Sequence, residues 1–182
     1  MSSVTPAELV VGVARGQRLV GRVCLFTTGQ TLKGQQFSAF HLVVKEGLSG
    51  VLFIEAWRDH ARRVATLVTA NCILEVCNIT AKALGDKAQW QCSDLDVYGQ
   101  VLGPTTLNLL DDDGTYPKTM PLVELRQLPN YRRIPHLISI AAMLVPAAPS
   151  SSSKATAPAT NLVLGAETQS VRVAVWKDMQ KK

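Results

Sequence analysis

The 182-residue chain has few aromatic residues, no closely spaced cysteine pair and no long apolar run. Aromatic side chains make up 5% of it, and its four cysteines include no C-x-x-C pair. Structural zinc sites draw their ligands from such pairs or from regularly spaced histidines, so we expect no metal and no cofactor. The apolar runs are far shorter than the roughly 20 residues that span a bilayer, and no secretory signal precedes them. These absences favour a soluble, intracellular protein without membrane contact.

The charge is basic but not concentrated in a tail. The chain has 19 basic and 14 acidic side chains, a net charge of +5. Residues 15–110 carry ten basic and seven acidic groups, and residues 111–182 carry nine and six. If a polyanion binds, a folded surface must therefore gather the positive charges.

Residues 17–57 contain three segments with the composition of β-strands. They are Arg18–Phe26, Phe37–Val44 and Val51–Trp57, separated by polar, glycine-containing loops at Thr27–Gln36 and Lys45–Gly50. Alternation along the third segment places Phe53, Glu55 and Trp57 on one face. Because Glu55 is a poor candidate for burial, this face is expected to be open to solvent.

The apolar spacing then becomes helical in Arg58–Val68 and returns to that of strands. The later strand segments are Cys72–Ile79 and Ala88–Leu95, joined by a turn at Leu84–Lys87, with Val97–Leu102 and Thr106–Leu110 extending the last strand around a bend. Five strands with one helix between the third and fourth is the plan of the oligonucleotide-binding (OB) fold, an all-β barrel. A sandwich would need about seven strands, and a Rossmann-type sheet would need a helix after most strands. We therefore predict an OB-fold domain over residues 15–112.

The C-terminal part is expected to begin a second unit. Residues 113–133 read as a linker with a short helix, Pro121–Leu128. Over residues 134–182 we expect a strand at Leu137–Val145, a flexible low-complexity loop at Pro146–Thr160, and a strand pair formed by Asn161–Leu164 and Ser170–Trp176.

An internal match supports this second unit. Leu52–Asp59 reads LFIEAWRD, and Val171–Asp178 reads VRVAVWKD. In both, an apolar strand ends in Trp, a basic residue and Asp, about 38 residues after the start of an earlier strand at Leu19 or Leu137. The matched spacing predicts a tandem repeat, with residues 134–182 forming the first strands of a second OB fold.

This arrangement resembles the tandem DNA-binding OB domains of the replication protein A large subunit, over about residues 17–182. In that family the third strand ends in an aromatic residue that stacks on a base, which Trp57 and Trp176 match. The family's second stacking aromatic lies where this sequence has Leu84, and Trp90 is near it but off register. The resemblance implies single-stranded DNA binding in DNA replication or repair, in the nucleus, together with other subunits.

Single-stranded DNA is held by aromatic side chains that stack on its bases and by a basic groove for its phosphates. In an OB barrel the groove crosses strands two and three, between the loop joining strands one and two and the hairpin joining strands four and five. The residues expected to contact DNA are Trp57, Arg22, Lys33, Phe40, Arg58, Lys82, Lys87, Trp90 and Trp176. Because every base has a face that can stack, little sequence specificity is expected. For Phe40 the simpler interpretation is a core residue, because a small barrel needs large interior side chains.

Two alternatives stay open at this stage, and a third is disfavoured. An OB-fold protein-interaction module, or a subunit scaffold in a DNA-maintenance complex, would use Trp57 to anchor a partner. RNA could take the place of DNA. Enzymatic activity is disfavoured, because the sequence has no phosphate-binding loop, nucleophile elbow or carboxylate pair in a cleft pattern.

Overall fold

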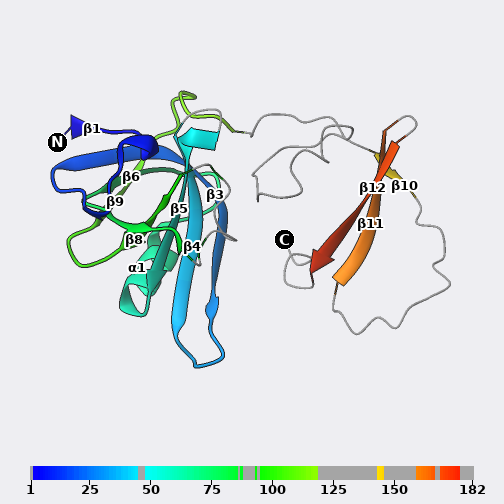
Figure 1. Ribbon diagram of the computed structural model, residues 1–182, viewed down its shortest axis with the longest axis horizontal. Coiled ribbons are helices and arrows are strands. Elements are labelled where there is room, and N and C mark those ends of the chain that lie inside the picture. Colours follow the sequence, from blue (N-terminus) through cyan, green and yellow to red (C-terminus); the bar gives the residue numbers. More distant parts are fainter. Residues whose placement is uncertain are drawn as a thin grey trace. The chain divides into compact units, whose positions relative to one another are not determined.

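The computed structural model describes residues 2–44, 48–85, 87, 93, 95–118, 143–145, 159–166 and 169–176. The chain divides into two compact units, Met1–Pro121 with Arg133–Leu137 and Leu122–Arg132 with Ile138–Lys182, each described here by itself (Figure 1). The predicted linker helix Pro121–Leu128 lies outside the described residues, as does most of the predicted strand Ala88–Leu95.

The first unit is built mainly of strands. In chain order these are β1 (Ser2–Ser3), β2 (Gly12–Val13), β3 (Gln17–Gln30), β4 (Gln36–Val43), β5 (Val51–Trp57), β6 (Ile73–Cys77), β7 (Thr80–Ala83), β8 (Val97–Val101) and β9 (Thr106–Leu110). Its described helices are α1 (Asp59–Leu67) and two single 3-10 turns, η1 (Pro6–Glu8) and η2 (Leu48–Gly50). The helix predicted over Arg58–Val68 is confirmed as α1, and it lies between β5 and β6. Within the described residues, no helix has the length and apolar character needed to cross a membrane.

The main sheet curls round on itself. β3 pairs antiparallel with β4, β4 pairs antiparallel with β5, and β5 pairs parallel with β8. β8 then pairs with β7, while β6 pairs with β3. The sheet runs from β3 through β4, β5 and β8 to β7. Only Asn78 and Ile79 separate β7 from β6, and β6 pairs with β3, so the path returns to its start. β9 pairs with β6, so the strand predicted to bend near Gly103 continues past that bend.

The core lies inside the curl. Alternate residues of β4 and β5, among them Phe40, Leu42, Leu52 and Ile54, have no exposed surface, and Val64 of α1 packs into the same cluster. The alternation predicted for β5 is therefore confirmed, since Ile54 belongs to the inward-facing set. Phe40 occupies the same interior and is a core residue.

The β3–β4 hairpin is longer than predicted. The expected loop Thr27–Gln36 is wrong, because β3 continues to Gln30 and β4 begins at Gln36, leaving a turn of residues 31–35. Two β-branched residues, Thr27 and Thr28, favour an extended backbone and pair across to β4. Gly34 supplies the positive φ (+74°) that the turn requires.

The second unit contains one described sheet. It consists of β10 (Met143–Val145), β11 (Ala159–Ala166) and β12 (Gln169–Trp176), in that order and all antiparallel. The predicted strand pair near residues 161–176 is confirmed as β11 and β12. The end of the predicted loop Pro146–Thr160 belongs to β11, and the rest of that loop lies outside the described residues. That this unit begins a second OB fold stays a prediction.

Candidate nucleic-acid interface

Three residues from neighbouring strands form a row on the outer face of the hairpin. Gly29 of β3 pairs with Phe37 of β4, and Phe37 pairs with Trp57 of β5. Directly opposed residues of antiparallel strands point to the same face. The two half-buried rings have centroids 5.9 Å apart and are tilted by 42°. A Cβ on Gly29 would lie 3.0 Å from the Phe37 ring, so the glycine makes room for that ring. We call Gly29, Phe37 and Trp57 the aromatic row.

The same face of the sheet is buried farther along the strands. His41 and Phe53 have ring centroids 5.3 Å apart, and Phe53 and Tyr98 have centroids 6.3 Å apart. All three side chains are buried. Among the described residues of this face, the half-buried rings therefore lie at the end nearest the hairpin turn, and the buried rings lie farther from it.

Between these two groups lies a buried carboxylate, Glu55, which is 5% exposed. Lys87 Nζ lies 2.8 Å from its Oε2, and Gln100 Nε2 lies 3.5 Å from its Oε1. Burial, followed by the neighbouring carboxylate of Glu55, raises the pKa of Tyr98, so the Tyr98 hydroxyl stays protonated. The expectation that Glu55 marks an unburied part of the face is wrong, because a carboxylate can be buried when its charge is paired.

Three exposed cations lie in the hairpin turn, directly after β5 and on β7. Lys33 lies in the hairpin turn, Arg58 follows Trp57 directly, and Lys82 of β7 pairs in register with Tyr98. Among the described residues, none of the three lies within salt-bridge distance of a carboxylate. Arg58 has a φ of +55° and a ψ of −123°, a backbone conformation that favours glycine. An arginine is thus held in a strained conformation at the edge of the row.

Arg22, expected on the floor of the groove, is instead buried at 2% exposure. Its guanidinium forms an ion pair of 2.8 Å with Asp112 and donates hydrogen bonds to the carbonyl oxygens of Asn71, Tyr116 and Pro117. The hydrogen bond from Arg22 is the first cause of a lowered pKa at Asp112. Arg22 therefore holds residues 112–117 against β3 and has no surface to offer a ligand. Together with Phe40, it drops out of the proposed interface.

The other predicted site residues differ in how near they lie to the aromatic row. Trp57 belongs to the row, Arg58 follows it directly, and Lys33 lies in the hairpin turn. Lys82 pairs with Tyr98 at the buried end of the face. Lys87 lies beside Trp57 with its Nζ 5.4 Å from the ring centroid. Trp176 ends β12 of the second unit. Its side chain, like the whole of Trp90, lies outside what the structure describes.

Sequence reasoning missed Phe37. Phe40, the phenylalanine chosen from β4, has the opposite parity along the strand and therefore points to the core. The signal was present, because pairing the second and third strands across the Lys45–Gly50 turn brings Phe37 opposite Trp57.

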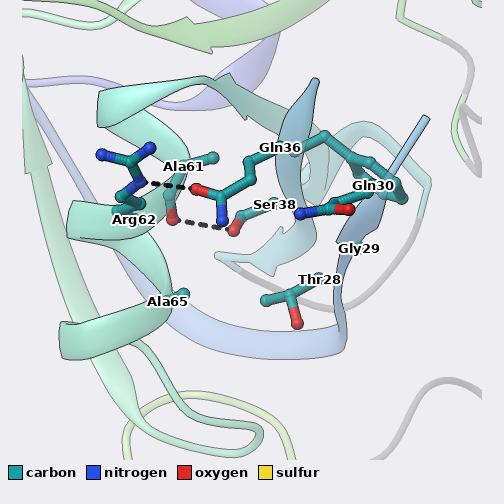
Figure 2. A pocket seen from close by; sticks show the side chains of 9 residues that line it. Thr28, Gly29, Gln30, Gln36, Ser38, Ala61, Arg62 and Ala65 are labelled. Carbon is teal, nitrogen blue, oxygen red and sulfur yellow. Dashed lines mark hydrogen bonds between the residues drawn. The ribbon is translucent and has the colours of Figure 1, made fainter. Parts of the chain in front are cut away.

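The other face of the hairpin borders a cleft of about 450 Å³ against α1. Here Thr28 pairs with Ser38, and Gln30 pairs with Gln36. Ser38 Oγ donates to the Ala61 carbonyl (2.9 Å), and Arg62 Nε donates to Gln36 Oε1 (2.7 Å), as Figure 2 shows. We call this the helix-side cleft. Its lining residues are Thr28, Gly29, Gln30, Gln36, Phe37, Ser38, Ala61, Arg62 and Ala65.

The curled, mostly β sheet with a single α-helix between β5 and β6 is an OB fold. The chain is similar to a chain in the structure of a replication protein A heterotrimer bound to single-stranded DNA, with a TM-score of 0.56 and 15% identity. The match covers 97% of this chain and 41% of that one, so this chain spans about two fifths of its length.

Two fission yeast structures are also similar, at a lower level. They are Pot1pC of Schizosaccharomyces pombe bound to single-stranded DNA and fission yeast Pot1 with single-stranded DNA, both with TM-scores of 0.41 and 9% identity. Each match covers 62% of this chain, and 89% and 41% of the respective partner chains. No protein-family model and no curated protein sequence matches the chain.

Proposed function

We propose that this protein binds single-stranded DNA in the manner of replication protein A, with little sequence specificity. The observation that carries the proposal is the aromatic row, in which two half-buried rings come from adjacent strands. The exposed cations Lys33, in the hairpin turn, and Arg58, directly after Trp57, have no carboxylate partner among the described residues. Stacking of a base on an aromatic ring contributes about 1–3 kcal/mol. Every base has a face that can stack, so such binding depends little on sequence. The similarity to a chain of a complex bound to single-stranded DNA supports the same function.

In this proposal the side chains have distinct roles. Phe37 and Trp57 stack on bases, while Lys33, Arg58 and Lys82 contact phosphates. Lys33 contacts the DNA from the hairpin turn. Lys82 contacts it from β7, which lies two strands beyond β5 in the sheet. The protein acts by binding and not as an enzyme.

The wider setting follows from the same similarity. We propose a role in DNA maintenance in the nucleus together with other subunits, because the similar chain belongs to a heterotrimer. We also propose that residues 15–112 form the first binding domain, residues 113–133 a linker, and residues 134–182 the start of a second OB fold. In that second fold, Trp176 would have the position that Trp57 has in the first.

The test is fluorescence anisotropy with labelled single-stranded DNA, duplex DNA and single-stranded RNA of equal length. We expect tight binding to single-stranded DNA, weak binding to the duplex, and an affinity that falls as salt rises. Equal binding to the duplex would contradict stacking on exposed bases. Preference for RNA would change the ligand and keep the interface.

A protein-interaction module is the second candidate, and the helix-side cleft favours it. Among the described residues, β6 pairs with β3 only through Arg18–Arg22, and no described strand pairs with the outer edge of β3 over Thr27–Gln30, where a partner could add a strand. An Ala65→Arg substitution would fill the cleft from the side of α1, opposite Gly29 and Phe37, the two residues of the aromatic row that also line the cleft. If it abolished partner binding and left DNA binding intact, the two functions would use separable surfaces of the hairpin.

A further inference from the structure

Lys87 was expected to contact phosphates, but its contacts differ from those of the other predicted cations. Lys33, Arg58 and Lys82 are exposed, whereas Lys87 is half-buried and its ammonium lies 2.8 Å from the buried Glu55 carboxylate. The same ammonium lies 5.4 Å from the Trp57 ring centroid and 5.8 Å from that of Tyr98. Lys87 is therefore paired with a carboxylate and lies near two aromatic rings at once.

These contacts restrict what Lys87 can do. A buried carboxylate is stable only while its charge is paired, and breaking such a pair from one side is strongly unfavourable. If Lys87 moved to a phosphate, it would leave Glu55 buried without its cation. The positive charge of Lys87 is thus cancelled within the protein, and a passing phosphate meets a neutral pair.

We propose that Glu55 and Lys87 form a neutral positioning pair that fixes the Trp57 ring for stacking, and that Lys87 makes no phosphate contact. Trp57 has two neighbours that can fix its ring, the Phe37 ring at 5.9 Å and the Lys87 ammonium at 5.4 Å. A ring fixed before binding loses less conformational freedom when a base stacks on it. This inference rests on the proposed function and assigns roles within that same site.

The test is the salt dependence of oligo-dT binding, because its slope counts the phosphate contacts made by cations. For single strands, each such contact contributes about 0.7 to the slope of log K against log salt. Lys33→Met, which removes an unpaired cation, should reduce the slope by about 0.7. Lys87→Met should leave the slope unchanged and weaken binding roughly 2- to 5-fold, the size of an exposed cation–π contact.

Glu55→Gln gives the opposite and most specific result. It releases Lys87 from its pair, so the slope should steepen by about 0.7 and affinity at low salt should rise. The double variant Glu55→Gln/Lys87→Met should return to the wild-type slope. It should also unfold at a higher temperature than Lys87→Met alone, because no unpaired buried charge remains. If Lys87→Met does not fold, the comparison of Glu55→Gln with the double variant still decides the question.

The outcomes separate this inference from the proposed function. If Lys87→Met lowers the slope as Lys33→Met does, Lys87 contacts phosphate and the positioning pair is overturned.

If the wild-type protein binds no oligonucleotide, the proposed function fails by itself. The pair is then tested by Trp57 fluorescence in a Trp90→Phe/Trp176→Phe background. An emission shift on Lys87→Met supports positioning of the ring, and an unchanged spectrum overturns it.

Discussion

The β3–β4 hairpin has two faces, formed by alternate residues of the same two strands. The faces differ in whether their side chains already have partners within the domain. On the helix-side cleft, Ser38 and Gln36 are hydrogen-bonded to α1, so these two polar side chains already have partners in the domain. On the other face, Phe37 and Trp57 remain half-buried, and nearby cations have no carboxylate partner among the described residues. The first face attaches the hairpin to the domain, whereas the second keeps surface available for a ligand.

The strongest way to test this comparison is to truncate two phenylalanines of β4 that point to opposite faces. Phe40 is fully buried, so Phe40→Ala should lower the free energy of unfolding by about 3–5 kcal/mol. Affinity for oligo-dT per folded molecule should be unchanged. Urea denaturation and anisotropy on the same preparation measure both quantities. A loss of affinity larger than the unfolded fraction explains would contradict the assignment of Phe40 to the core.

Phe37→Ala is the matched control, three residues earlier on the same strand. It should weaken oligo-dT binding by about 1–3 kcal/mol, a factor of about 5 to over 100. Its effect on stability should be smaller than that of Phe40→Ala, because the Phe37 ring is only half-buried. If Phe37→Ala destabilised the protein without changing affinity, the aromatic row would be structural.

Substitutions of Arg58 test whether this side chain, which has a strained backbone conformation, contributes to DNA binding. Glycine adopts its φ of +55° and ψ of −123° without strain, so Arg58→Gly should stabilise the protein by about 1 kcal/mol, within the usual range for such strain. It should also flatten the salt dependence of binding by about 0.7. Arg58→Ala separates the two effects, because it removes the charge and keeps the strain. A destabilised Arg58→Gly would show that the arginine side chain contributes more than the strain costs.

Ser38→Ala should have the smallest effect. It removes the hydrogen bond to the Ala61 carbonyl and should lower stability by about 0.5–1.5 kcal/mol. DNA affinity should not change, because Ser38 points away from the aromatic row. A change in affinity of several-fold would show that the two faces of the hairpin are coupled.

The first three long strands and the position of the helix could be predicted from the sequence, because both follow from local periodicity, whereas β7 (Thr80–Ala83) was not predicted as a strand. Trp57 was placed at the end of β5 by the same reasoning. Phe37 required pairing two strands, a step beyond the periodicity of either one. The burial of Arg22 depends on residues 112–117, some 90 positions later, and that of Glu55 depends on Lys87. Local patterns carry no signal for such partners, so charged residues in strands were assigned to the surface.

The central claim is that single-stranded DNA binds on the aromatic row, and Trp57→Ala tests it most directly. Thermal stability and oligo-dT affinity should be measured on the same protein. We predict a loss of affinity of about 1–3 kcal/mol with a melting temperature close to that of the wild type. A lower melting temperature with unchanged affinity per folded molecule would contradict the claim, make Trp57 a structural residue and favour the protein-interaction module.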